Sequence, residues 1–242
     1  MKKNSKANRR KQKVLDATND LVPRETHFSY RNRLKPRSDN QKNYIRNIAE
    51  NVITFCHGLP GSGKTHIAVG MAIEYLIENK VDKIIITRPV IEAGEKIGYL
   101  PGSAEEKLHP YLLPILDEIN HFIPTSYYTK LKNDMKFEIV PLAHMRGRNF
   151  HNAFIVADEC QNATYDQLKM LLTRTGRESK MVLTGDIGQS DLHYSIRGGF
   201  MTMIDALEGI EGIASSRLEA MDIVRNPIIS KIIARLDNIE QK

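Results

Sequence analysis

Cysteine, tryptophan and long apolar runs are scarce or absent in this 242-residue chain, and each scarcity excludes a class of protein. The two cysteines, Cys56 and Cys160, are too few for a disulfide framework or a zinc site, so both are expected to be reduced thiols in or near the core. No apolar run reaches the ~18 residues of a membrane span, and the amino-terminal MKKNSKANRR has no apolar segment after its charges. We therefore expect a cytoplasmic protein without a membrane partner.

Positive charge is concentrated at the amino terminus. Residues 1–37 hold 12 Lys or Arg against 3 Asp or Glu, whereas the remaining residues hold 23 against 26. The net charge of +6 therefore belongs to this first segment. Apart from a short helix around 14–20, it shows no sustained hydrophobic period, so we predict a flexible basic arm over 1–37 and one folded domain over 38–242. Such an arm either attracts nucleic acid through its phosphates or is simply solvated.

The segment Val52–Tyr75 contains the most informative motif. GLPGSGKT at 58–65 matches the phosphate-loop pattern G-x-x-x-x-G-K-[ST]. An apolar run before it predicts a buried strand, and apolar residues at helical spacing after it predict a helix. Glycines let successive backbone N–H groups converge on phosphates at the helix amino terminus, where the helix dipole adds positive charge. The predicted nucleotide-binding residues here are Gly58, Leu59, Pro60, Gly61, Ser62, Gly63, Lys64, Thr65 and His66.

Two residues of this motif and two acids further along have distinct chemical roles. The Lys64 ammonium is suited to hold the β and γ phosphates, and the Thr65 hydroxyl is suited to bind Mg²⁺. FIVADE at 154–159 predicts a buried strand that ends in two carboxylates. Asp158 is predicted to bind Mg²⁺ together with Thr65, while Glu159 polarises the attacking water.

Polar residues at other element ends extend the predicted nucleotide site, because the active groups of open parallel sheets collect at the carboxyl ends of strands. KMVLT at 180–184 is followed by Asp186 and Gln189, and Gln189 is suited to sense the γ-phosphate. Gln41 lies at the start of a helix predicted from Ser38 onward. Its side-chain amide can both donate to and accept from an adenine edge.

Basic residues at two further places are candidates for binding nucleic acid. The strand predicted at 83–87 ends in a Thr-Arg-Pro corner on the side of the phosphate loop, and a later loop offers two arginines around a glycine. For the two loop arginines, a neighbouring subunit's nucleotide and plain solvent are the alternatives. Because tryptophan is absent, we expect phosphate contacts rather than base readout. The residues assigned to RNA or single-stranded nucleic acid are Thr87, Arg88, Arg146 and Arg148.

The remaining pattern alternates between helices and strands. This alternation, with functional groups at several strand ends, predicts an α/β fold with a doubly wound, mainly parallel sheet. Residues 91–122, rich in glycine and proline before a helix near 112–122, are interpreted as an insertion or lid over the edge of the sheet. The other predicted elements are a strand at 137–140, a helix at 164–175, a helix ending at 207, a strand at 210–214 and a last helix from 226.

From about residue 38 to 235 the chain resembles the phosphate-starvation-inducible PhoH-like ATPases, many of whose shorter members are encoded by bacteriophages. The strings that carry the resemblance are GLPGSGKT, TRP, EAGEKIGYLPG, PLAHMRGR, ADECQN, KMLLTRTG, TGDIGQSDL and DIVRNP. The resemblance implies a RecA-like phosphate-loop core related to the motor domain of superfamily 1 helicases, with ATP and Mg²⁺ as cofactors and RNA-related work. It implies functional roles for Gln41, Lys64, Thr65, Asp158, Glu159 and Gln189.

The chain departs from the usual family pattern at three places. Leu59 and Pro60 stand where proline and alanine are usual, and Cys160 stands where DEAQ has alanine. These changes leave the liganding groups in place. Gly188 replaces the usual threonine of GDITQ and lies beside the predicted γ-phosphate sensor.

The expected activity is Mg²⁺-dependent ATP hydrolysis, coupled to RNA or single-stranded nucleic acid by a helicase-like motor core. The alternative is a non-motor ATP-dependent switch or scaffold that regulates a partner without nucleic acid. A small-molecule kinase is disfavoured because Glu159 directly after Asp158 suits water activation. One core leaves a face of the nucleotide open, so we expect a homo-oligomer, a ring such as a hexamer, in which an arginine reaches a neighbour's nucleotide. Arg174 is the first candidate, and Arg148 and Arg225 are the others.

Overall fold

The computed structural model describes residues 30–89 and 104–223 except positions 187, 189, 191 and 193–197, together with position 235; of residues 104–111 it describes the backbone. The described residues from Arg31 onward belong to one compact unit. The helices expected around 14–20 and from 226 onward lie outside the described residues, as do residues 91–103 of the segment expected to form a lid.

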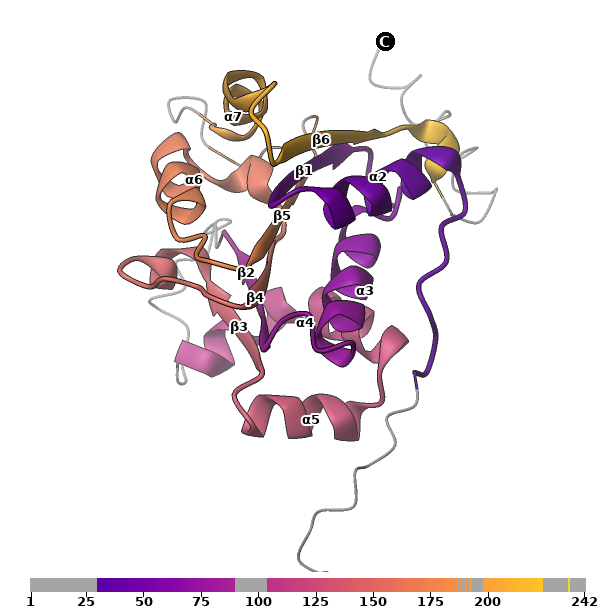
Figure 1. The fold of residues 1–242 in the computed structure, drawn as a ribbon, viewed down its shortest axis with the longest axis vertical. Coiled ribbons are helices and arrows are strands. Elements are labelled where there is room, and N and C mark those ends of the chain that lie inside the picture. Colours follow the sequence, from indigo (N-terminus) through magenta and orange to yellow (C-terminus); the bar gives the residue numbers. More distant parts are fainter. Residues whose placement is uncertain are drawn as a thin grey trace, which may run out of the picture. The chain divides into compact units, whose positions relative to one another are not determined.

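Helices and strands alternate along the described chain (Figure 1). The helices are α2 (Asp39–Glu50), α3 (Lys64–Ile77), α4 (Ala104–Phe122), α5 (Thr125–Asn133), α6 (Tyr165–Leu172) and α7 (Phe200–Leu207). The strands are β1 (Ile53–Gly58), β2 (Lys83–Arg88), β3 (Phe137–Pro141), β4 (Ala153–Ala157), β5 (Lys180–Gly185) and β6 (Ile213–Leu218). Short 3₁₀ turns are η2 (Leu142–Met145), η3 (Cys160–Asn162) and η4 (Ala220–Asp222).

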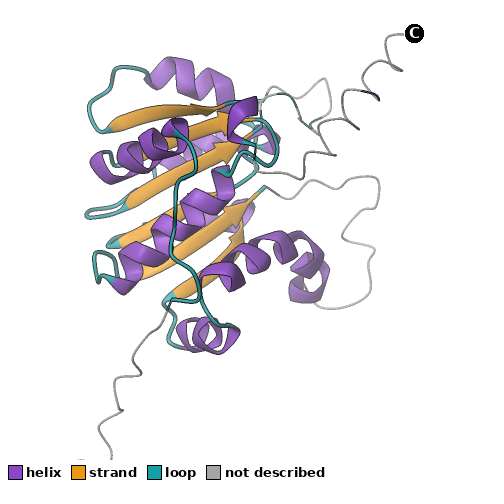
Figure 2. Ribbon diagram, turned by 90° about the vertical axis from the view of Figure 1, so that its right-hand side faces the viewer, coloured by secondary structure: helices purple, strands orange, loops and turns teal. Residues whose placement is uncertain are grey.

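The six strands form one sheet in the order β3-β2-β4-β5-β1-β6, and every neighbouring pair is parallel. Figure 1 shows α2, α3 and α4 on one side of this sheet and α6 and α7 on the other; Figure 2 shows the strands running in one direction between the two helix layers. Parallel strands need crossover connections, and helices on both faces supply them. The predicted α/β fold with a doubly wound parallel sheet is confirmed.

Burial on both faces explains why the central strands are continuous apolar runs. All five residues of β4 are buried, and successive side chains point to opposite faces. Phe154 packs its ring against Tyr75 of α3, with ring centroids 5.3 Å apart. Ile155 belongs instead to the cluster that includes Leu168 of α6 and Phe200 of α7. Helices on both faces therefore fix the position of β4, and with it the position of the polar residues that follow this strand.

The structure corrects three of the predicted element bounds. α4 begins at Ala104 rather than near 112, and α5 has no counterpart among the predicted helices. The last strand begins at Ile213 rather than at 210, because Ile210 accepts a hydrogen bond from Ile213 in a turn and is 47% exposed. Between 112 and 122 the segment expected to form a lid is a helix that packs on α3: a Cβ added to Gly70 would lie 2.8 Å from Cζ of Phe122.

The longest described helix, α4, has 19 residues and carries charged side chains, among them Asp117 and Glu118. None of the described helices is both long and apolar enough to cross a lipid bilayer.

Candidate nucleotide-binding site

The loop between β1 and α3 adopts backbone conformations that require glycine. Gly58 has φ 156°, Gly61 has φ 78° and Gly63, the residue before α3, has φ 95°. A Cβ on Gly58 would lie 2.2 Å from the carbonyl oxygen of Leu218 in the neighbouring strand β6. These glycines let the chain turn tightly out of β1, so that the loop leads directly into the amino terminus of α3.

Lys64 is the first residue of α3 and folds back over the loop. Its ammonium donates to the carbonyl oxygens of Gly58 at 2.7 Å and Leu59 at 2.9 Å. Burial lowers the pKa of this ammonium, and nearby acids, Asp186 foremost, act in the opposite direction. A phosphate placed here would add negative charge beside Lys64 and favour its charged form.

Asp158 connects the phosphate loop with the ends of two central strands. Its Oδ1 accepts hydrogen bonds from the Thr65 hydroxyl at 2.7 Å and the Thr184 hydroxyl at 2.6 Å. Its backbone N–H donates to the carbonyl oxygen of Thr87 at 2.9 Å, which continues the pairing of β4 with β2. Asp158 is 4% exposed. The phosphate loop and the acidic strand end, far apart in sequence, thus meet at one point.

Glu159 follows Asp158 in a left-handed conformation, with φ 56°. Its two carboxylate oxygens have different partners: Oε1 forms an ion pair with Nη2 of Arg88 at 2.8 Å, and Oε2 accepts from Nε2 of Gln161 at 2.5 Å. Gln161 also accepts from the backbone N–H of Asp186 at 2.9 Å through its own oxygen. The ends of β2, β4 and β5 are therefore connected through this carboxylate.

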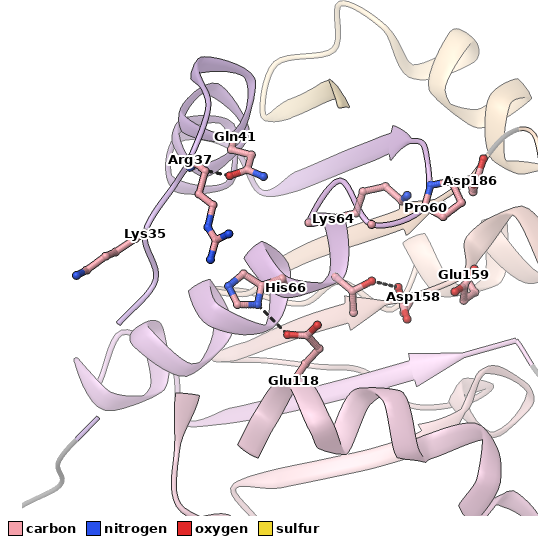
Figure 3. A pocket seen from close by; sticks show the side chains of 14 residues that line it. Lys35, Arg37, Gln41, Pro60, Lys64, His66, Glu118, Asp158, Glu159 and Asp186 are labelled. Carbon is pink, nitrogen blue, oxygen red and sulfur yellow. Dashed lines mark hydrogen bonds and ion pairs between the residues drawn. The ribbon is translucent and has the colours of Figure 1, made fainter. Parts of the chain in front are cut away.

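These groups line a pocket of about 540 Å³ at the carboxyl ends of the strands (Figure 3). The part of the pocket nearest the sheet is lined by Lys64, Thr65, Asp158, Glu159 and Asp186. Asp186 is 6% exposed; its Oδ1 accepts from the N–H of Gly188, and its Oδ2 has no hydrogen-bond partner among the described residues. The pocket thus combines a lysine, a hydroxyl and three carboxylates at the end of a glycine loop.

Sequence reasoning missed the segment before α2, which lines the far part of the pocket with Lys35 and Arg37. We call residues 31–37 the strap. The strap is tied to α4 by the N–H of Arg31, which donates to the carbonyl oxygen of Phe122 at 2.9 Å. The sequence signal was the run of basic residues directly before the capping residue Ser38.

Gln41 joins the strap to the phosphate loop. Its Oε1 accepts from the N–H of Arg37 at 2.8 Å, and its Nε2 donates to the carbonyl oxygen of Ser62 at 2.9 Å. Gln41 lines the pocket but is 4% exposed. A contact between this amide and adenine stays a prediction, while its position shows that it supports the loop.

His66 also lines the pocket, as part of a pair that sequence reasoning missed. Its Nδ1 lies 2.8 Å from a carboxylate oxygen of Glu118 on α4, and its ring packs 4.7 Å from the ring centroid of Phe122. No periodicity in the sequence indicates that these residues meet, since 52 positions separate His66 from Glu118.

The site fits Mg²⁺ and a nucleoside triphosphate. Mg²⁺ prefers oxygen ligands and is commonly held by one or two protein groups together with phosphates and water. Thr65 and Asp158 offer such oxygens within 2.7 Å of each other, at the loop whose backbone leads into α3. Among the described residues no group of three or more His, Cys, Asp or Glu could hold a metal by itself.

The residues assigned to nucleic acid differ in their exposure and in the contacts that they make. Thr87 is fully buried, so its side chain offers no surface contact, which corrects its assignment. Arg88 forms the ion pair with Glu159. Arg146 is exposed on the loop after η2, and Arg148 forms an ion pair with Glu138 at 2.6 Å. Gln189 and Arg225 lie outside the described residues.

Arg174 lies away from the pocket of its own chain. Its Nη1 donates to the carbonyl oxygen of Arg148 at 3.4 Å, and its own carbonyl oxygen accepts from the N–H of Phe150. Phe150 shortly precedes β4, so this arginine pair lies near the amino-terminal edge of the sheet, whereas the phosphate loop lies at the carboxyl edge. Arg174 therefore lies at the opposite edge of the sheet from the phosphate loop.

The two cysteines are buried and free. Burial raises the pKa of both thiols well above the ordinary value, which keeps them neutral. Cys160 donates to the carbonyl oxygen of Ala157 at 3.2 Å and occupies a core position beside the acidic pair. Cysteine in place of the usual alanine at this position therefore fills the core with a larger side chain and introduces no charge.

Comparisons with known proteins agree on one family. The family described as PhoH-like protein matches residues 33–237. A PhoH-like protein of Synechocystis is 42% identical over 200 residues, covering 83% of this chain and 61% of the relative. A PhoH-like protein of Bacillus subtilis is 41% identical over 197 residues (81% and 62%), and Protein PhoH of Escherichia coli is 37% identical over 199 residues (81% and 56%). The chain thus spans about three fifths of the length of these relatives.

Solved structures with a similar arrangement include the Pif1 helicase of Candida albicans and the UvsW helicase of bacteriophage T4. The first is 16% identical with a TM-score of 0.46, covering 85% of this chain and 44% of the helicase. The second is 17% identical with a TM-score of 0.45, covering 81% of this chain and 65% of the helicase.

Proposed function

Because the chain belongs to the PhoH-like protein family, we propose that it binds ATP with Mg²⁺, hydrolyses ATP, and couples hydrolysis to RNA or single-stranded nucleic acid as an oligomer. The observation that carries the proposal is the 2.7 Å hydrogen bond between the Thr65 hydroxyl and Asp158. It supports a shared site at which the phosphate loop and the acidic strand end act on the same triphosphate.

Each residue of the pocket then has a chemical part in hydrolysis. Lys64 leaves the loop carbonyls and holds the β and γ phosphates, while Thr65 and Asp158 hold Mg²⁺. Bound Mg²⁺ supplies charge neutralisation to the phosphoryl oxygens. Glu159 accepts a hydrogen bond from the attacking water and orients it in line with the leaving group. Asp186, whose Oδ2 has no hydrogen-bond partner among the described residues, raises the pKa of Lys64 by its negative charge and so favours the charged ammonium.

Nucleotide binding is tested by calorimetric titration with MgATP. Lys64→Ala is expected to weaken ATP binding by about 10- to 100-fold, because charge-assisted hydrogen bonds to phosphate are lost. Lys80→Ala is the matched control: it removes an exposed lysine that pairs with Glu78, outside the pocket. Failure of the wild-type protein to bind ATP, or equal affinities of all three proteins, would overturn the proposed function.

The nucleic-acid part of the proposal is supported by the basic residues at positions 1–37 and by Arg88 and Arg146. A motor and a switch differ in one measurable respect. Single-stranded RNA should stimulate ATP turnover of a motor, whereas a switch or scaffold that regulates a partner should hydrolyse ATP at the same rate with and without RNA. Steady-state turnover with and without an oligouridine therefore decides between them.

Oligomer formation is proposed because Arg174, the first candidate for an arginine that acts on the γ-phosphate, lies away from the pocket of its own chain. Arg174→Ala is expected to lower turnover by about 10³-fold while leaving ATP affinity unchanged, since an arginine supplied by a neighbour acts on the transition state. Arg177→Ala, three residues on and also basic, is the control. Solution mass should exceed that of the 27.6 kDa monomer. A monomer, or a fully active Arg174→Ala variant, would remove Arg174 from this role.

A further inference from the structure

Each carboxylate oxygen of Glu159 has a hydrogen-bond partner in the described structure. Arg88 pairs with Oε1 at 2.8 Å and Gln161 donates to Oε2 at 2.5 Å. A carboxylate that orients water needs an acceptor position aimed at that water, and the guanidinium of Arg88 occupies a position on Oε1. Held in this way, Glu159 is in a restrained position rather than one aimed at an attacking water.

The two partners of Glu159 differ in what else they bind. Gln161 belongs to the interior: it is 7% exposed and uses its oxygen to accept from the N–H of Asp186. Arg88 is the last residue of β2, and its side chain is 21% exposed. Gln161 is therefore fixed by the fold, whereas Arg88 reaches solvent at the same edge of the sheet as the pocket.

A guanidinium is well suited to exchange one anionic partner for another. Carboxylate and phosphate oxygens both match its fork of N–H donors, and both can be bound in pairs. An exchange of Glu159 for a phosphodiester leaves Arg88 with an anionic partner in either state. In the second state Glu159 keeps its hydrogen bond from Gln161, and its side chain is 35% exposed, so water can solvate the carboxylate and the two states can lie close in free energy.

We propose that Arg88 is a positioning residue that exchanges Glu159 for a phosphodiester of single-stranded RNA, so that RNA binding at the end of β2 frees Glu159 to orient water. Gln161 keeps its hydrogen bond during the exchange and holds Glu159 close to Asp186. The inference rests on the proposed function for its catalytic consequence, but its binding consequence does not require ATP.

Thermodynamic linkage gives a test without nucleotide. If RNA and Glu159 compete for Arg88, neutralising Glu159 must tighten RNA binding. Glu159→Gln is expected to bind a fluorescein-labelled oligouridine about 10-fold more tightly than the wild type, as measured by anisotropy at fixed salt. Glu78→Gln removes the same charge from an exposed ion pair with Lys80 and should change the affinity less than about twofold.

Arg88 variants complete a double-mutant cycle. Arg88→Gln is expected to weaken RNA binding. In the Arg88→Gln background, Glu159→Gln should no longer change the RNA affinity, whereas in the Arg88→Lys background it should still change it in part. Thermal unfolding establishes that each variant is folded. In turnover assays Arg88→Gln should hydrolyse ATP faster than the wild type without RNA and lose stimulation by RNA.

The outcomes separate this inference from the proposed function. Equal RNA affinities of wild type and Glu159→Gln, in a protein that binds and hydrolyses ATP, would overturn the exchange and leave the ATPase standing. Slower basal turnover of Arg88→Gln would also overturn it, since Arg88 would then support Glu159 rather than restrain it. If Glu159→Gln tightens RNA binding in a protein that binds no ATP, the exchange at Arg88 would stand and the proposed ATPase function would be overturned.

Discussion

Glu159→Gln is expected to lower the rate of ATP hydrolysis by about 10³-fold while leaving ATP affinity within a factor of two. General-base catalysis contributes ~10²–10⁴-fold, and an amide cannot take the proton of the attacking water. The side chain keeps its size, but its amide has one acceptor oxygen, so it can keep either the contact with Arg88 or the contact with Gln161 and not both. The measurement is single-turnover hydrolysis of ATP, with calorimetric titration for affinity.

The control for this substitution is Glu78→Gln, which makes the same chemical change at an exposed site on the carboxyl end of α3. It should hydrolyse ATP at the wild-type rate. Rapid hydrolysis by Glu159→Gln would instead assign the orientation of the water to another acid of the pocket. Asp186 would be the next candidate, because its Oδ2 has no hydrogen-bond partner within the described part of the chain.

Gly58→Ala is expected to destabilise the fold by about 3 kcal/mol and to abolish ATP binding. A positive φ costs an alanine about 1–2 kcal/mol, and a forced contact in a packed interior costs a further ~1–3 kcal/mol. The added Cβ would meet the carbonyl oxygen of Leu218 at 2.2 Å, its carbonyl carbon at 2.9 Å and its Cβ at 3.1 Å. Because Gly58 is paired with Leu218 across β1 and β6, relief of the contact requires the strands to separate.

Gly209→Ala is the matched control, because Gly209 has φ 80° but nothing within 4 Å of an added Cβ. It should lose only the backbone part, about 1–2 kcal/mol. Urea denaturation measures both free energies of unfolding. Equal losses in the two variants would mean that the contact with Leu218 relaxes at no cost, and would contradict the account of the loop given above.

The central strands and the meeting of loop and acids could be predicted because local patterns determine them. Strands such as β4 are buried on both faces and are therefore uninterrupted apolar runs, and parallel strands present their carboxyl ends at one edge. Given that rule, a lysine at the end of one strand and two acids at the end of another are expected at the same edge. The family resemblance is confirmed by the comparisons.

The edge of the sheet and the side-chain pairs could not be predicted in the same way. β6 has one strand neighbour, and its residues alternate between exposed and buried near its end, so IASSRL lacks the apolar run of a central strand. The pairs of Arg88 with Glu159 and of His66 with Glu118 join positions 71 and 52 residues apart. Such pairs depend on which strands and helices become neighbours in the folded chain, and hydrophobic periodicity does not predict them.

The side-chain amide of Gln41 couples the strap to the phosphate loop. Its two hydrogen bonds connect the backbone of Arg37 with that of Ser62, and Arg31 is in turn connected to α4. Any shift of the loop would therefore also move the strap, whose other end is hydrogen-bonded to α4. A spectroscopic label on the outer surface of the strap would report phosphate occupancy from outside the pocket, where it obstructs nothing.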